Sequence, residues 1–272
     1  MPESVKRREV GKLGRNLGPS SLHGAVMLED YLTNPFPKWT GNDDFTSGVR
    51  DWGLFGNGPD PLVTNQGPDF QGVGNCGFCE DVHKNMADAW DTGEQPKGNW
   101  TDSSVWPTPN QLVAEYLAYN NGQDIGVDLG QFLLWRCSNS LGPLKPIGGF
   151  AELSPPHGAL YTDAFHVFGG LWAGIAVSQE MMDEAMAGEP WTSTATDWIG
   201  GHAVPHLARN SKWGRCITWG FDQLFSWQNW MVTAQEAFVV LTPEMMATPG
   251  GVFHGVNVAK LKADIVALHG QL

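Results

Sequence analysis

The chain has 272 residues and a formal net charge of −13, from 16 Lys and Arg against 29 Asp and Glu. A surface this acidic argues against nucleic-acid binding, because phosphate contacts require clustered basic side chains. No apolar run is long enough to cross a bilayer, and no apolar segment follows the first charges as it would in a secretory signal. We therefore expect neither a nucleic acid nor a membrane as a partner, and a location in the cytoplasm.

Composition predicts an arm, a body and a terminal helix. Residues 1–50 combine a basic start with Gly, Pro and Asn, and predict an extended N-terminal arm that lies on the body. Residues 51–246 are expected to form this body, helical from 51 to 170 and rich in strands from 171 to 246. Residues 247–272 hold a strongly amphipathic helix that we expect to pack on the body. Helices followed by strands favour an α+β fold.

Secondary structure is predicted from hydrophobic periodicity and from residues that favour helix ends. Asn110 is expected to cap one helix, Asp128 the next, and Ser178 a later Met-rich helix. Buried strands are expected where apolar and β-branched residues run together. Further predicted helices cover residues 159–168, 227–232 and 258–268, and predicted strands cover 171–177, 202–204, 215–219 and 236–241.

The central feature of the sequence is Gly74-Asn75-Cys76, which opens a predicted amphipathic helix. A cysteine at a helix N-terminus is a good nucleophile, because the unpaired N–H groups and the helix dipole favour the thiolate. Two alternatives stay open. Cys76 and Cys79 either pack as buried thiols or form half of a zinc site, for which the sequence shows no second cysteine pair. We expect no metal and no cofactor.

His202 stands in a special context among the eight histidines of the chain. In Gly200-Gly201-His202-Ala203-Val204, a double glycine leads into the head of an apolar strand, which fixes the imidazole but leaves it approachable. A histidine beside a cysteine acts as a general base and then as a general acid. Cys76 and His202 are therefore candidate catalytic residues, and the alternative for His202 is a packed core histidine.

These motifs resemble those of the papain-like cysteine peptidases. Gly74-Asn75-Cys76 is similar to the Gly-Ser-Cys that opens the family's central helix, His202 to its catalytic histidine, and Trp219-Gly220 to the end of its Asn-Ser-Trp-Gly motif. The resemblance implies an α+β papain-like fold, in which a helical N-terminal half has its central helix from about residue 76. A strand-rich C-terminal half follows, with a cleft between the halves for a peptide or amide substrate. In another register, Cys79 is the nucleophile.

One position departs from the family pattern at the histidine. Ile217 stands where the family has the asparagine that orients the imidazole, and an isoleucine cannot accept an imidazole N–H. Either Thr218 or Asp222 is expected to take this role. If neither does, the resemblance implies the fold without the activity.

The oxyanion hole and the prosegment depart from the pattern as well. Gln71 lies one residue away from the position of the family's oxyanion-hole glutamine and is the preferred candidate, with Asn57 and Gln66 as weaker ones. The family's enzymes are usually made with a long inhibitory prosegment, whereas the part of this chain before Cys76 is short. An active protease without an inhibitory prosegment is hazardous to its host cell, which favours a hydrolase of narrow specificity or an inactive fold.

From end to end, the sequence also resembles a group of papain-like proteins from actinobacteria and their tailed phages. The similarity rests on Lys12-Leu13-Gly14-Arg15, Trp52-Gly53-Leu54-Phe55-Gly56-Asn57, Gly74-Asn75-Cys76, Gly200-Gly201-His202-Ala203-Val204 and Thr218-Trp219-Gly220. It implies an alternative function, that of a catalytically inert structural protein of a virion, such as a minor capsid, decoration or tail component. The N-terminal arm is then expected to bind other virion proteins, and the location is the virion.

Overall fold

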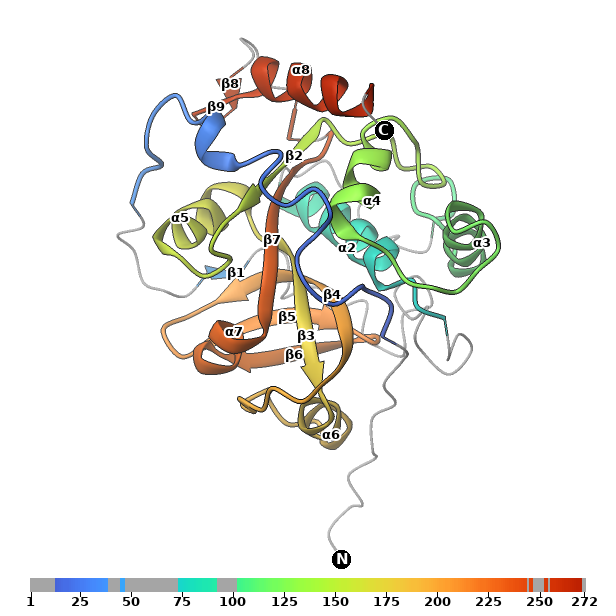
Figure 1. Cartoon of the computed structure of the whole chain (residues 1–272), viewed down its shortest axis with the longest axis vertical. Helices are drawn as coiled ribbons and strands as arrows, with labels where there is room; N and C mark the ends of the chain where they lie inside the picture. Colours follow the sequence, from blue (N-terminus) through green and yellow to red (C-terminus); the bar gives the residue numbers. More distant parts are fainter. Residues whose placement is uncertain are drawn as a thin grey trace, which may run out of the picture.

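A seven-stranded antiparallel sheet forms the centre of the fold (Figure 1). Its strands lie in the order β2-β7-β3-β4-β5-β6, and β1 pairs with β4 beside this path. The computed structural model describes residues 13–38, 45–46, 73–91, 102–243, 245–246, 252–253 and 255–270. The strands are β1 (Phe45–Thr46), β2 (Gly149–Leu153), β3 (Leu171–Ser178), β4 (Trp198–Arg209), β5 (Trp213–Thr218), β6 (Phe221–Ser226) and β7 (Ala234–Leu241), with β8 (Val252–Phe253) and β9 (Val256–Asn257) forming a separate pair.

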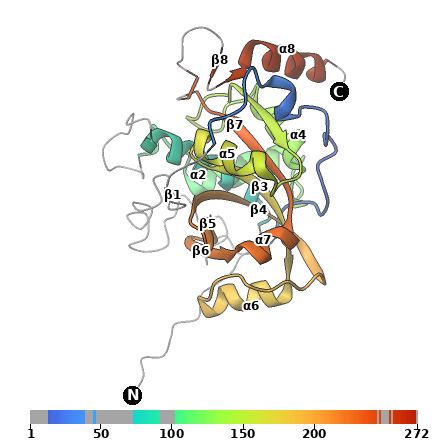
Figure 2. The ribbon, with the colours of Figure 1, turned by 90° about the vertical axis from the view of Figure 1, so that its left-hand side faces the viewer.

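Helices surround this sheet, and α6 and α8 lie at opposite ends of the molecule (Figure 2). Within the part of the chain that the structure describes, none of them is both long enough and apolar enough to cross a bilayer. The helices are η1 (Leu28–Tyr31), α2 (Cys76–Asp91), α3 (Pro109–Tyr119), α4 (Leu129–Arg136), α5 (Ala159–Phe168), α6 (Gln179–Ala187), α7 (Trp227–Thr233) and α8 (Val258–His269).

α2 is a buried helix that packs against β4 and β3. Every residue from 76 to 89 is buried, charged side chains included. Burying a charge is costly unless the charge is paired. Lys84 pairs with Asp88 one turn later, and Asp81 accepts a hydrogen bond from Arg136 of α4 at 2.6 Å. These pairs allow the helix to be enclosed on all sides, which fixes its N-terminus against the sheet.

Several helix ends lie where local sequence chemistry predicts them. α5 spans the predicted residues 159–168 and ends where Gly169 adopts the left-handed conformation with φ 63°. The side chain of Asp128 caps α4, and that of Ser178 caps α6. Each cap accepts a hydrogen bond from a backbone N–H of the first turn, which has no partner within the helix.

The start of α3 differs from the prediction. Thr108 caps this helix, and Asn110, the expected cap, lies inside its first turn. The Thr108 side chain accepts from the Gln111 backbone N–H, and the Gln111 side chain accepts from the Thr108 N–H, which completes a capping box. Pro109 occupies the first helical position, where the missing N–H costs nothing.

β2 is an element that the sequence did not predict. All five of its residues are buried, and it pairs with β7, with Phe150 opposite Val240. Because both faces of the strand are covered, the segment lacks the alternation of polar and apolar residues that identifies a half-buried strand. The sheet therefore takes a strand from the predicted helical half, and the boundary at residue 170 does not separate helices from strands.

The described part of the N-terminal arm is packed against the body. Within residues 13–38, the apolar side chains of Leu28, Tyr31 and Phe36 are buried. The Tyr31 hydroxyl donates a hydrogen bond to Asp264 of α8 at 3.0 Å, and α8 also packs on β2. The arm thus connects the C-terminal helix with the sheet.

A buried ion pair fastens the arm to the middle of the sheet. Arg15 Nε donates to Glu236 Oε1 of β7 at 2.7 Å, and both side chains are 1% exposed. Gly174 of β3 provides the space, because a Cβ atom there would lie 2.1 Å from Arg15 Nε. A second donor of the guanidinium, Nη1, reaches Gln235 Oε1 at 2.8 Å.

Candidate active site

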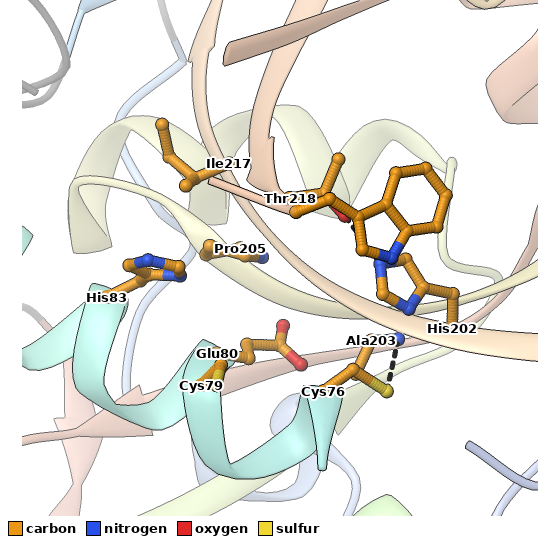
Figure 3. Close-up of a pocket in the computed structure, with 10 residues that line it drawn as sticks. Cys76, Cys79, Glu80, His83, His202, Ala203, Pro205, Ile217 and Thr218 are labelled. Atoms are coloured by element: carbon orange, nitrogen blue, oxygen red, sulfur yellow. Dashed lines mark hydrogen bonds between the residues drawn. The ribbon is translucent and has the colours of Figure 1, made fainter. Parts of the chain in front are cut away.

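Cys76 is the first residue of α2 and lies where the helix meets β4. It is 2% exposed, and its Sγ accepts a hydrogen bond from the backbone N–H of Ala203 at 3.4 Å (Figure 3). The backbone carbonyl of Asn75 accepts from the N–H groups of Phe78 and Cys79, so the helix begins sharply at the cysteine. The sulfur is therefore held between a helix N-terminus and the strand that carries His202.

His202 lies on β4, 1% exposed, with its two ring nitrogens in different surroundings. Nε2 is 2.6 Å from Thr218 Oγ1, whereas Nδ1 has no hydrogen-bond partner in the described chain. In Figure 3 the ring lies between Thr218 and Cys76. If Nε2 carries the proton and donates it to Thr218, the lone pair of Nδ1 is left on the side of the thiol.

Trp219 fixes the His202 ring from its face. The two rings are stacked, with centroids 4.7 Å apart and an angle of 17° between their planes. Trp219 and Gly220 both have positive φ, 47° and 78°, and form the two-residue turn between β5 and β6. A tryptophan rarely adopts this conformation, and a two-residue hairpin of this kind requires it at both positions. The Trp-Gly pair thus makes the turn and positions the imidazole.

A cavity of about 10 Å³ separates α2 from the strands at this point. The Glu80 side chain extends from α2 into the same space (Figure 3). Its Oε1 accepts from the backbone N–H of Ala173 at 2.7 Å, and its Oε2 has no hydrogen-bond partner in the described residues. This volume is at the lower limit of the space that one water molecule needs. The residues lining the cavity are Cys76, Cys79, Glu80, His83, His202, Ala203, Pro205, Ile217, Thr218 and Trp219.

Burial sets the protonation states of these groups. It raises the pKa of Cys76 to about 11, although hydrogen bonds from the Ala203 and Gly14 backbones act in the opposite direction. Burial lowers the pKa of His202 to about 3, with a further contribution from the charge of Arg15. It also raises the pKa of Glu80 well above its usual range. In this closed arrangement the site is a neutral thiol beside a neutral imidazole.

The fold is similar to that of a known protease. No protein-family model and no curated protein matches the chain. Among solved structures, it is similar to xylellain, a cysteine protease from Xylella fastidiosa, with a TM-score of 0.57. The alignment covers 88% of this chain and 99% of that one, at 10% identity. The chain has a cysteine-protease-like fold. The expected closeness to proteins of actinobacteria and tailed phages finds no support in these comparisons.

Within this cysteine-protease-like fold, three of the predicted site residues come together. Cys76, His202 and Thr218 line the same cavity from α2, β4 and β5. Cys79, the alternative nucleophile, lies one turn further along α2 and lines the cavity too. Cys76 lies more than 100 residues before His202 and Thr218 in the chain, so only the fold joins it to them.

Asp222, the other candidate for orienting His202, is not among the residues that line the cavity. It lies opposite Ile217 in the β5–β6 register, and its carboxylate is 3.6 Å from the Arg215 guanidinium. Thr218 is the next residue along β5 and provides the hydroxyl that contacts His202.

The predicted oxyanion-hole residues lie outside the described residues. This holds for Gln71, the preferred candidate, and for Asn57 and Gln66. For the zinc alternative, neither Cys76 nor Cys79 forms a disulfide. In the same described ranges, no group of three or more His, Cys, Asp or Glu side chains is arranged to hold a metal ion.

Sequence reasoning missed the arm as part of the site. Gly14 and Arg15 influence the protonation of Cys76, the first through a backbone hydrogen bond and the second through its charge. The one signal that pointed to them was the segment Lys12-Leu13-Gly14-Arg15, on which the expected resemblance to actinobacterial and phage proteins partly rests. A short segment that contains glycine does not reveal which residues it contacts when those residues lie far away in the sequence.

His83, which lines the cavity, provides a test of the burial of the site. Burial lowers its pKa to about 3, so the folded chain keeps it neutral while the unfolded chain binds a proton below about pH 6.5. Stability is therefore fully present above pH 6.5 and lost as the pH falls toward 3. Relative to His83→Gln, the wild type is expected to lose about 2 kcal/mol between pH 7.5 and 5.0.

Urea denaturation of both proteins at the two pH values measures this difference. Because other titrating groups are common to both proteins, their effects cancel in the comparison. An identical pH dependence in the two proteins would mean that His83 takes up its proton without unfolding, which contradicts its enclosure.

Proposed function

We propose that the chain is a thiol hydrolase of peptide or amide bonds, with Cys76 as the nucleophile and His202 as the general base. Thr218 is its positioning residue, in place of the asparagine of papain-like enzymes. We also propose the papain-like layout, in which the helical part carries the cysteine and the sheet carries the histidine. The observation that supports this most directly is the hydrogen bond between His202 Nε2 and Thr218, which leaves Nδ1 for the thiol.

The reaction follows from these positions. His202 Nδ1 takes the proton of Cys76, and the sulfur attacks the carbonyl carbon of the substrate. The C–N bond then breaks, and the imidazolium gives its proton to the leaving amine. Water, deprotonated by His202, hydrolyses the thioester and frees Cys76. The backbone N–H of Cys76, at the N-terminus of α2, is a candidate oxyanion donor, with the Gln71 side chain as the proposed second one.

The closed state opposes the first of these steps. A proton transfer from Cys76 to His202 separates charge in a site where burial raises the first pKa and lowers the second. Substrate binding or opening that brings polar groups to the pair reduces this cost. We therefore propose a latent hydrolase, whose thiol becomes reactive when the site opens.

Alkylation of Cys76 tests this proposal. Iodoacetamide is added at pH 6 to the wild type, to His202→Ala and to His83→Ala, and the modified peptide is quantified by mass spectrometry. Iodoacetamide reacts with Cys76 when the site opens transiently, and in that state an activated thiol is expected to react about tenfold faster in the wild type than in His202→Ala. His83→Ala, which removes a histidine from the same cavity, controls for a general loosening and is expected to keep the wild-type rate or exceed it. Equal rates in the wild type and His202→Ala would refute the hydrolase.

The inert alternative has one observation in its favour, the enclosure of the neutral pair around a cavity of about 10 Å³. Under this alternative the chain is a structural component of a virion, and its arm binds neighbouring subunits. Quantitative mass spectrometry of purified virions decides it, because a structural component is present in a fixed ratio to the capsid protein. If the protein is absent from virions and the alkylation result is positive, the structural alternative is rejected and the hydrolase is retained.

A further inference from the structure

Residues 13–16 of the arm run between two walls that meet at the candidate active site. On one side, the Arg15 N–H donates to the carbonyl of Gly201, the neighbour of His202, at 3.1 Å. On the other side, the Asn16 N–H donates to the Val127 carbonyl at 3.1 Å, and the Val127 N–H donates to the Gly14 carbonyl at 2.9 Å. The segment is thus bound by its backbone, in the manner of a strand added between two edges.

Four glycines and one valine line this space, which we name the arm slot: Gly74, Gly126, Val127, Gly200 and Gly201. A Cβ atom on Gly201 would lie 2.6 Å from the Arg15 carbonyl oxygen, and one on Gly126 would lie 2.5 Å from the Gly14 carbonyl oxygen. A Cβ atom essentially never lies this close to a non-bonded backbone atom. The slot therefore accepts an extended backbone at van der Waals distance and leaves no room for a Cβ atom at Gly126 or Gly201.

The occupant must be glycine at the position next to the nucleophile. A Cβ atom on Gly14 would lie 1.9 Å from the Gly74 carbonyl oxygen, two residues before Cys76. The backbone of Gly14 also makes a hydrogen bond to the Cys76 thiol. Since the Gly14 carbonyl is bonded to Val127, the segment presents an N–H to the sulfur.

We propose that residues 13–16 are an intramolecular ligand of the arm slot, and that the slot is the site at which an external extended peptide with glycine beside Cys76 binds after the arm leaves. The proposal deepens the proposed function and rests on it for the fate of that peptide. Two side-chain contacts set how firmly the arm is held: Arg15 with Glu236, and Arg15 with Gln235. The occupied slot then accounts for a Cys76 that is 2% exposed.

Two substitutions expel the arm from opposite sides of the slot. Gly14→Ala changes the occupant and Gly201→Ala changes the wall, and neither glycine has a positive φ that would strain an alanine. Gly270→Ala is the matched control, because the nearest atom to its Cβ lies at 3.6 Å. The readouts are the rate of Cys76 alkylation by iodoacetamide and the hydrogen exchange of the Asn16 and Val127 amides. Circular dichroism establishes that each variant is folded.

Both slot variants are expected to speed alkylation of Cys76 by about tenfold or more and to lose exchange protection at residues 16 and 127, because the arm then opens locally. The Gly270→Ala control is expected to match the wild type. Folded variants with wild-type alkylation and wild-type exchange would overturn the proposal. If one variant fails to fold, the other carries the test alone, since the two clash with different partners.

A peptide experiment tests the glycine requirement. A synthetic peptide of residues 12–16, added at millimolar concentration to Gly14→Ala, is expected to restore the slow alkylation of Cys76. The same peptide with alanine in place of its glycine is expected not to. Equal protection by both peptides, or by neither, would overturn glycine selection by the slot.

These readouts need no turnover, which separates this inference from the proposed function. Faster alkylation in the slot variants, with no difference between the wild type and His202→Ala, would keep the slot and refute the hydrolase. Unchanged alkylation in the slot variants, with a clear effect of His202→Ala, would keep the hydrolase and refute the arm as its ligand.

Discussion

Replacing Glu236 with alanine is expected to lower the free energy of unfolding by about 3–5 kcal/mol, because it leaves a buried arginine without its counterion. Arg15 and Glu236 are each 1% exposed and joined at 2.7 Å. A guanidinium cannot escape the cost by losing its proton. The second carboxylate oxygen of Glu236 also accepts the Ser20 N–H at 2.8 Å, so this donor loses its partner too. Urea denaturation at neutral pH measures the effect.

Two further variants separate the charge from the general cost of truncation. Gln235→Ala removes a neutral partner from the same guanidinium and is expected to cost only about 1 kcal/mol. The double variant Arg15→Met with Glu236→Leu removes both charges and is expected to recover most of the loss, as apolar replacements of buried pairs often do. A loss below about 1 kcal/mol in Glu236→Ala would mean that Arg15 reaches solvent, in conflict with its burial.

Replacing Thr218 with valine is expected to reduce the rate of Cys76-dependent hydrolysis about a hundredfold while the chain stays folded. Valine keeps the shape of threonine but removes the hydroxyl 2.6 Å from His202 Nε2. Without this partner the ring can carry its proton on Nδ1, where it blocks transfer from the thiol. Alkylation of Cys76 at pH 6 is expected to fall in the same variant, and both rates are measured beside the wild type.

Thr218→Ser is the matched control, because it keeps the hydroxyl and removes only a methyl group. It is expected to retain most of the activity. If Thr218→Val and Thr218→Ser are equally active, Thr218 does not position the imidazole. A fall in both variants together with a lower melting temperature would instead point to packing of the β5 end as the role of this residue.

Elements whose ends depend on nearby residues were predictable from the sequence. The cap at Ser178 and the stop at Gly169 are decided within a single turn, so local chemistry is sufficient. β2 was not predictable in this way. Its burial comes from β7, α4 and α8, which lie on other parts of the chain. The residues of β2 themselves show no hydrophobic periodicity from which these contacts could be predicted.

The candidate site also divides into residues that their neighbours in the sequence indicate and residues that only distant contacts reveal. Cys76 and His202 stand in glycine-flanked motifs, and a reader of the sequence can select both. The choice between Thr218 and Asp222 depended on the pairing register of β5 with β6, which the sequence did not settle. The assignment of Gly14 to the site depended on its contacts with Gly74 and with the Cys76 thiol, and no residue near Gly14 in the sequence indicates either contact.

The contact between Arg15 and Glu236 also bears on biosynthesis, because the two residues are 221 positions apart. At about 5–20 residues per second, the ribosome makes the arginine on the order of 10 to 40 s before its partner. For most of this interval the arm cannot bind in the slot, since Gly201 is made late and the strand with Glu236 is made later still. His202 is made late as well. The reactive pair and the contacts that cover it are thus both completed late in synthesis, which limits the exposure of the nascent chain and its neighbours to an uncovered reactive thiol.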